Sequence, residues 1–161
     1  MAVLNNTGVR AGASGAGGDE EYQIQKSIGF NMERGTNFSK TPSSASNRST
    51  WSLSFWVKRN EIFYKPHVLL AAGTDANCTR LEFTNSNELQ FSVGGTVWRK
   101  TNKQFCDIDA WYHIVVTLDT TNGTADDRCR MYMNGEQLTS FATNATITQN
   151  STDSLINNNV K

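Results

Sequence analysis

Apolar residues recur at every second position in short runs along most of this sequence, and this period of two constrains the fold most strongly. In STWSLSFWVKRN one face of an extended chain is apolar, with Trp51, Leu53, Phe55 and Val57. The opposite face carries Ser52, Ser54, Trp56 and Lys58. A side-chain period of two is that of a β-strand, whereas a helix needs a period near 3.6. No capped segment with a helical period runs beyond two turns, so the sequence predicts an all-β fold.

Three further runs follow one another closely and predict a meander. CTRLEFT, NELQFSV and TVWRKT are joined by the short turn sequences NSN and GG, after a short buried run, HVLLAAG. Such spacing is typical of tight hairpins. We expect one inner face to carry Leu81, Phe83, Leu89, Phe91 and Val93. Many short strands separated by turns indicate a sandwich or a barrel.

The stretch WYHIVVTLDTTNGTADDRCRMYMNG, residues 111–135, predicts the middle of an antiparallel sheet. Apolar groups occur on both faces of WYHIVVTLD, so we expect a central strand that is covered on both sides. The polar gap 119–127 predicts a long hairpin loop. Asn134-Gly135 favours a type I′ turn, which needs two positive φ angles. The next predicted strand is EQLTSF.

The N-terminal region differs from the rest. Residues 1–20 include AGASGAGG, which has too little apolar surface to offset its ordering entropy, so a flexible Gly/Ala-rich arm is expected. Two readings stay open, a plain disordered terminus and an anchor that orders against a partner. The following run, YQIQKSIGFNM, alternates as a strand through Tyr22, Ile24, Ile28 and Phe30.

Length, charge and cysteine content exclude several classes. The 161 residues suit one domain, here 21–161, and 15 basic residues balance 15 acidic ones. Without a basic excess, nucleic-acid binding is not expected. No apolar run approaches the ~18 residues of a membrane span, and no signal peptide is evident. Cys78, Cys106 and Cys129 fit no metal-binding spacing, which favours free thiols.

Blocks of this sequence resemble a known family. WYHIVVTLDTTNGTADDRCRMYMNGEQLTSF is similar to the central hairpin of the concanavalin A-like lectin/glucanase superfamily, in its laminin-G-like branch. FSKTPSSASNRSTWSLSFWVKRN, the later LEFTNSNELQFSV and the opening MAVLNNTGVRAGASGAGG resemble structural proteins of marine tailed bacteriophages. The resemblance implies an antiparallel jelly-roll β-sandwich. The family usually continues with an aromatic-rich closing strand, whereas this sequence reaches LINNNVK. Either the native chain extends beyond Lys161, or the closing strand comes from elsewhere.

The resemblance also directs attention to acidic residues. Glucanases on this fold use alternating carboxylates, and retaining hydrolysis needs two carboxyl groups ~5 Å apart. Only Asp107 and Asp109 approach this pattern, without a third acid, and a solvated turn is the favoured reading. His113, between apolar neighbours, is read as a structural histidine. We therefore expect no enzymatic activity.

Calcium and sugar are the ligands that the resemblance suggests. Asp119, Asp126 and Asp127 flank the 119–127 loop and offer hard oxygen ligands for calcium, although a flexible acidic loop is the alternative. No other cofactor is expected. Trp56 and Trp98 lie opposite the best apolar face of their strands. They are read either as exposed rings that stack on carbohydrate or as core residues of a second face.

The resemblance implies a non-enzymatic structural and binding module on the outside of a tailed-phage virion: a tail fibre, an appendage or a capsid decoration. Binding is expected on the face near Trp56 and Trp98, or on loops 60–66 and 119–127. The alternatives are a dedicated host-glycan lectin and, more distantly, a glycoside hydrolase. Assembly in the host cytoplasm, virion partners and a homo-oligomer are expected. Contacts would come from residues 1–32, with Ile24, Ile28 and Phe30 as an uncovered apolar patch, or from 141–161.

Overall fold

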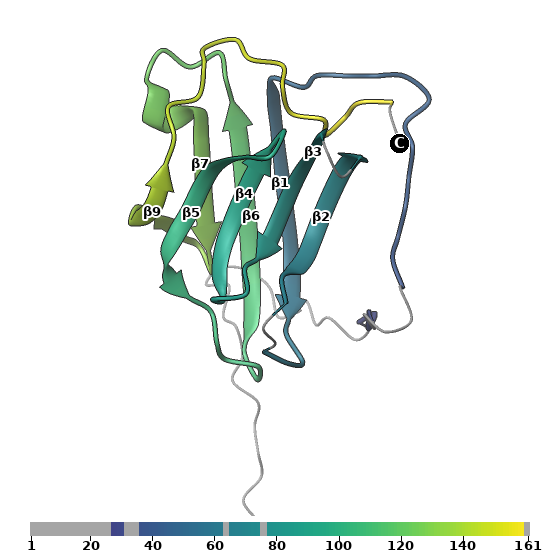
Figure 1. Cartoon of the computed structure of the whole chain (residues 1–161), viewed down its shortest axis with the longest axis vertical. Helices are drawn as coiled ribbons and strands as arrows, with labels where there is room; N and C mark the ends of the chain where they lie inside the picture. The colour runs from purple at the N-terminus through teal and green to yellow at the C-terminus, as the bar shows by residue number, and fades with distance from the viewer. Residues whose placement is uncertain (1–26, 31–35, 63–64, 75–76, 160–161) are drawn as a thin grey trace, which may run out of the picture. The chain divides into compact units, whose positions relative to one another are not determined.

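A computed structural model describes residues 27–30, 36–62, 65–74 and 77–159. The chain divides into two compact units, Met1–Phe38 and Ser39–Lys161, and the strands belong to the second (Figure 1). Within the described residues, no helix is long and apolar enough to cross a membrane. The predicted arm, residues 1–20, and the predicted assembly residue Ile24 lie outside the described residues.

The strands form two antiparallel sheets. The four-stranded sheet has the order β1-β6-β7-β8, with bounds Thr50–Lys58, Trp111–Asp119, Cys129–Met133 and Glu136–Leu138. The five-stranded sheet has the order β2-β3-β4-β5-β9, with bounds His67–Thr74, Asn77–Phe83, Glu88–Val93, Thr96–Gln104 and Phe141–Asn144. A 3-10 turn, Ala125–Arg128, lies in the β6–β7 loop. The predicted all-β fold is confirmed, and its two sheets are those of a β-sandwich of the jelly-roll kind.

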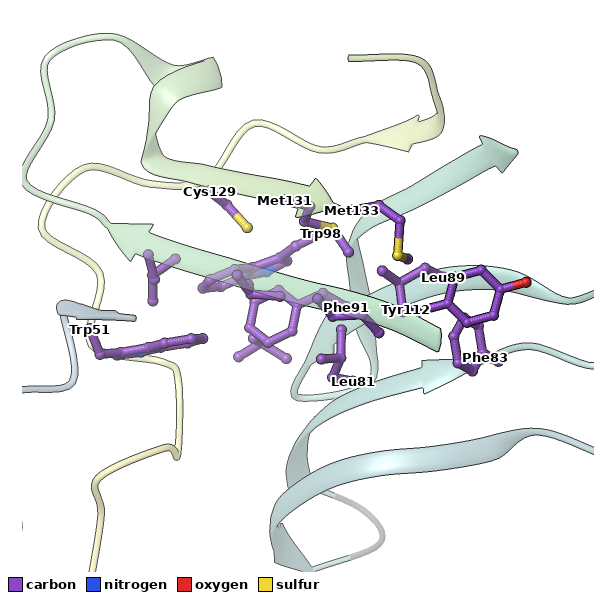
Figure 2. Close-up of a cluster of buried hydrophobic side chains, with 14 of the residues drawn as sticks. Trp51, Leu81, Phe83, Leu89, Phe91, Trp98, Tyr112, Cys129, Met131 and Met133 are labelled. Carbon is purple, nitrogen blue, oxygen red and sulfur yellow. The ribbon is translucent and has the colours of Figure 1, made fainter. Parts of the chain in front are cut away.

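One hydrophobic core joins the two sheets. The meander residues predicted to share an inner face are all buried: Leu81, Phe83, Leu89, Phe91 and Val93. From the other sheet the core receives Trp51, Tyr112, Ile114, Val116, Leu118, Cys129, Met131 and Met133. Figure 2 shows Cys129, Met131 and Met133 pointing into the same cluster as Leu81, Phe83 and Phe91. The period of two therefore predicted the inner faces correctly.

Strand β5 contains an irregularity at Trp98, and Trp98 is not the exposed ring that one of its two predicted roles required. Phe91 pairs with Arg99 and Ser92 pairs with Val97, which leaves Trp98 as an extra residue in a β-bulge. Trp98 lies two residues after Thr96, the partner of buried Val93, so its ring is on the inner side and packs edge-to-face with Phe91 at 5.9 Å between ring centroids (Figure 2). Across the bulge Arg99, the partner of Phe91, is buried as well. The alternative reading of Trp98 as a core residue is the one that the structure supports.

The predicted Asn-Gly turn is confirmed. Asn134 has φ 52° and Gly135 has φ 85°, the two positive values that a type I′ turn needs. The Asn134 side chain also accepts a hydrogen bond from the His113 N–H at 2.8 Å. The strand predicted after this turn, EQLTSF, is split. Its first part forms β8, and after Thr139 and Ser140 the chain enters the other sheet as β9.

Two other expectations are wrong. Residues 27–30 form no strand, although Ile28 and Phe30 are exposed as predicted, at 65% and 52%. Strand β6 is central, between β1 and β7, but its second face is not covered within the described residues. Trp111 on that face is 44% exposed. A sheet with one solvated face is common for antiparallel pairing.

The segment after β9 runs back over the ends of both sheets (Figure 1). Ile147 is buried, Asn150 N–H donates to the carbonyl of Thr120, and Leu155 N–H donates to the Thr79 hydroxyl at 2.7 Å. We call residues 145–159 the C-terminal strap. Residues 141–159, predicted to contact partners, thus make many contacts within their own unit. The three cysteines are free thiols, as expected.

Candidate functional site

The outer face of the four-stranded sheet carries a group of aromatic rings away from the core. We define the aromatic face by Trp56, Trp111, His113 and Tyr132, which lie on β1, β6 and β7. Each of these side chains lies on the side of its strand opposite the buried residues. Polar side chains of the same register surround the rings: Ser52, Ser54, Lys58, Thr117, Arg130 and Gln137.

Strand pairing places the rings side by side. Trp56 is directly opposite His113, and Trp111 is directly opposite Lys58, so the two indoles are diagonal neighbours across β1 and β6. Diagonal neighbours on one sheet face are typically about 7–8 Å apart. Trp56 is 43% exposed and Trp111 is 44% exposed. The result is a pair of half-exposed indoles on one surface.

The Trp56 ring is held in place by stacking on a neighbouring side chain. Its indole stacks on the His113 imidazole, with ring centroids 4.8 Å apart and planes 23° apart. Ser54 Oγ lies 2.9 Å from His113 Nε2 and fixes the imidazole in turn. A ring fixed in this way loses little conformational freedom when a ligand lies on it.

Of the two tryptophans predicted to be exposed rings, the structure exposes only Trp56. Trp98 lies in the other sheet, buried at 7% exposure, and is not part of the aromatic face. The sequence reasoning did not select Trp111. The alternation in WYHIVVTLD could have indicated Trp111, because it places Trp111 and His113 on the same side of the strand. Trp56 lies on the corresponding outward side of its own strand.

Comparison with protein families matches residues 33–160 to the model of the concanavalin A-like lectin/glucanases superfamily. The chain belongs to this superfamily. No curated protein matches it. Membership of the superfamily supports a module of the carbohydrate-binding type.

The three acids predicted as calcium ligands are not brought together. Asp119 Oδ1 accepts bonds from the backbone and hydroxyl of Thr121, and Asp126 Oδ1 accepts one from Asn144 Nδ2. Asp127 pairs with Arg130 at 3.0 Å and, with its hydrogen bond as the main cause, raises the pKa of Arg130. Across the described ranges, no group of three or more His, Cys, Asp or Glu side chains is placed to hold a metal ion. A calcium site there would need the loop to rearrange.

Asp107 and Asp109, the two acids whose spacing comes nearest to a glucanase pair, lie in the turn before Trp111. Asp107 Oδ1 accepts bonds from the N–H groups of Asp109 and Ala110, at 2.9 and 3.2 Å, which makes it the cap of a turn. Asp109 is exposed and lies 3.9 Å from Lys58 Nζ. The predicted solvated turn before Trp111 is confirmed.

Proposed function

We propose that this chain is a non-enzymatic carbohydrate-binding module whose binding surface is the aromatic face. The observation that carries the proposal is the pair of half-exposed indoles, Trp56 and Trp111, on one face of the four-stranded sheet. The apolar C–H face of a sugar ring packs well on an indole, and hydroxyl, amide and charged groups around it can bind the sugar hydroxyls. Ser54, Arg130 and Gln137 supply such groups. The binding needs no cofactor.

We further propose that the module works on the outside of a tailed-phage virion, with a host-surface glycan as its ligand. The support is the sequence resemblance of residues 38–60 and 81–93 to phage structural proteins. In this setting the module assembles in the host cytoplasm, contacts other virion proteins and forms a homo-oligomer. Calcium at Asp119, Asp126 and Asp127 stays a prediction.

The test is binding of the purified chain to an array of immobilised glycans. Wild type should bind a subset of sugars, and the double variant Trp56→Ala/Trp111→Ala should lose on the order of tenfold or more in affinity. Val68→Ala is the matched control, because Val68 is also exposed, at 51%, but lies in β2 of the other sheet. The sugar-binding proposal would be contradicted if wild type bound nothing on the array. It would also be contradicted if Val68→Ala lost as much affinity as the double variant.

A purely structural assembly protein is the second candidate. It is favoured by the exposed apolar side chains of Ile28, Phe30 and Phe38, the last at 75% exposure. Phe30 and Phe38 pack edge-to-face at 5.3 Å between centroids. Under this reading, replacing all three by Ser should prevent incorporation into virions, while the glycan array stays negative for wild type.

The absence of hydrolysis is part of the proposal and has its own test. The chain should release no reducing sugar from β-glucans, because Asp107 caps a turn. Measurable hydrolysis that Asp107→Asn or Asp109→Asn abolishes would overturn it.

A further inference from the structure

The loop between β6 and β7 contains an Asn-Gly pair, Asn122-Gly123, that has no part in the aromatic face. The loop lies at the end of the sandwich that the C-terminal strap crosses, where Gln149 Nε2 donates to the Thr121 carbonyl at 3.1 Å (Figure 1). Asn-Gly is the dipeptide most prone to deamidation, because glycine has no side chain to keep its own nitrogen away from the asparagine amide. The local geometry decides whether the pair reacts in the folded chain.

The Asn122 side chain is folded over the peptide nitrogen that attacks it in deamidation. Its Oδ1 accepts a hydrogen bond from the Thr124 N–H, two residues further along the chain, at 2.8 Å. This Asx turn closes a ring that contains the Gly123 nitrogen, so Asn122 Cγ lies on the same side of the chain as that nitrogen. Among the described residues, nothing accepts a hydrogen bond from the Gly123 N–H, and a Cβ at Gly123 would meet nothing within 4 Å. The nucleophile is therefore free and unobstructed.

Hydrogen-bond donors are placed where negative charge develops in this reaction. Attack by the Gly123 nitrogen turns Asn122 Oδ1 into an oxyanion, and the Thr124 N–H already points at that oxygen. Loss of the Gly123 amide proton spreads charge onto the Asn122 backbone carbonyl, which belongs to the same peptide group. Arg128 Nε donates to this carbonyl at 2.8 Å, and its Nη2 donates to the Gly123 carbonyl at 3.2 Å. Arg128 is 7% exposed, so water screens its charge only weakly.

The second Asn-Gly pair of the sequence, Asn134-Gly135, has a different arrangement. Asn134 Oδ1 accepts from the His113 N–H, so its side chain is directed toward β6. Gly135 leads into β8, and β7 lies between β6 and β8 in the sheet. The side-chain amide of Asn134 is therefore directed away from the Gly135 nitrogen. Because Asn134 is exposed and Asn122 is half-buried, access of water alone would favour reaction at Asn134.

We propose that Asn122 is a site of spontaneous deamidation and that Asn134 is protected from it. The Gly123 nitrogen loses its proton to water or hydroxide and bonds to Asn122 Cγ, and the Cγ–Nδ2 bond breaks as the amide nitrogen leaves as ammonia. Water then opens the cyclic imide at either of its two carbonyls, which yields aspartate or isoaspartate.

The modification changes the charge of this loop. The formal net charge of the chain, zero in the sequence, falls by one. In the isoaspartate product the former Asn122 backbone carbonyl becomes a carboxylate, so Arg128 gains an ion-pair partner where it had a neutral acceptor. The inference does not rest on sugar binding at the aromatic face, so either can fail without the other.

The experiment is incubation of the whole purified chain at mildly alkaline pH, followed by peptide mapping with mass spectrometry. The same chain unfolded in guanidinium chloride gives the reference ratio of the two rates, because there neither pair keeps its folded geometry. Relative to that ratio, folding should favour Asn122 over Asn134 by on the order of tenfold or more. Folding that leaves the ratio unchanged, folding that favours Asn134, or an Asn122 that does not react in the folded chain would overturn the proposal.

Variants of the loop test the roles of the two neighbouring residues. Thr124→Pro removes the N–H that faces Asn122 Oδ1 and should slow deamidation several-fold, and the φ of Thr124, −88°, is close to the range of proline. Thr124→Ala keeps the N–H and is the matched control, with an expected rate equal to wild type. Gly123→Ala is a second variant, which should slow the reaction by hindering the nitrogen while the open space around it keeps the chain folded. Wild-type rates at Asn122 in folded Thr124→Pro and Gly123→Ala variants would reject the proposal.

Discussion

The indole of Trp56 lies on the imidazole of His113, with ring centroids 4.8 Å apart, and Ser54 Oγ fixes that imidazole at 2.9 Å. Trp56 and Ser54 come from β1, and His113 comes from β6. Strand pairing therefore builds a three-residue support in which the exposed ring rests on a histidine that is itself hydrogen-bonded. The proposed binding ring is positioned before any ligand arrives.

The first prediction concerns this support. His113→Ala should lower glycan affinity several-fold, because the Trp56 ring loses the surface that orients it and must be ordered on binding. The measurement is tryptophan emission during titration with a glycan selected from the array. His113→Phe should restore most of the affinity, since a ring is again present beneath the indole. Full affinity in a folded His113→Ala variant would show that the stack has no positioning role.

The second prediction concerns the hairpin at Asn134-Gly135. Gly135→Val should lower the free energy of unfolding by roughly 1–3 kcal/mol, because a β-branched residue resists positive φ. The cause is backbone strain and not a clash, since a Cβ at Gly135 would meet nothing within 4 Å. Thermal melting measures the effect, with Gly123→Ala in the β6–β7 loop, at the other end of β7, as control. A melting temperature equal to wild type would contradict the assignment of strain to this turn.

Alternation and turn chemistry predicted much of the fold. The inner faces of β3, β4 and β6 follow directly from a period of two, because core packing and strand geometry select the same residues. Asn134-Gly135 specified its own turn, since its φ values are those that Asn and Gly adopt most readily.

The rest depends on interactions that a single sequence does not display. The bulge at Trp98 shifts the register of β5, and nothing in TVWRKT marks the extra residue. The break at Thr139 and Ser140 moves the chain between sheets, although EQLTSF reads as one strand. At the aromatic face, the sequence predicted Trp56 as a binding residue but not Trp111. The two are neighbours only through pairing between strands more than 50 residues apart.

The third prediction concerns Arg99, which is 1% exposed and lies inside the sandwich. Its guanidinium donates to four backbone carbonyls, those of Trp98, Cys129, Ala145 and Asp126. Arg99→Met should therefore lower the free energy of unfolding by about 3 kcal/mol or more, since several buried carbonyls lose a charged donor. Urea unfolding is the measurement, and Arg130→Met is the control, because Arg130 forms an exposed pair with Asp127 and should change little. Equal stability of the two variants would show that water replaces the guanidinium.

The last prediction concerns pH and His67. Burial, and next the Arg59 guanidinium, lower the pKa of His67 below its ordinary 6.5, while Glu61 acts in the opposite direction. His67 Nδ1 lies 3.4 Å from Arg59 Nη2, and Arg59 is itself buried and donates to the Phe105 carbonyl. Protonated His67 would therefore place a second cation beside a buried one.

The sign of the effect follows from linkage. As pH falls through about 6.5, the unfolded chain takes up a proton at His67 before the folded chain does, so the free energy of unfolding decreases. The decrease levels off below the folded pKa, where both states are protonated. Urea midpoints measured between about pH 7.5 and pH 5 should fall for wild type, and fall less for His67→Gln, which keeps an acceptor for Arg59 but does not titrate. Identical pH profiles for the two proteins would mean that His67 is hydrated when the chain is folded and that the Arg59–His67 contact does not couple to stability.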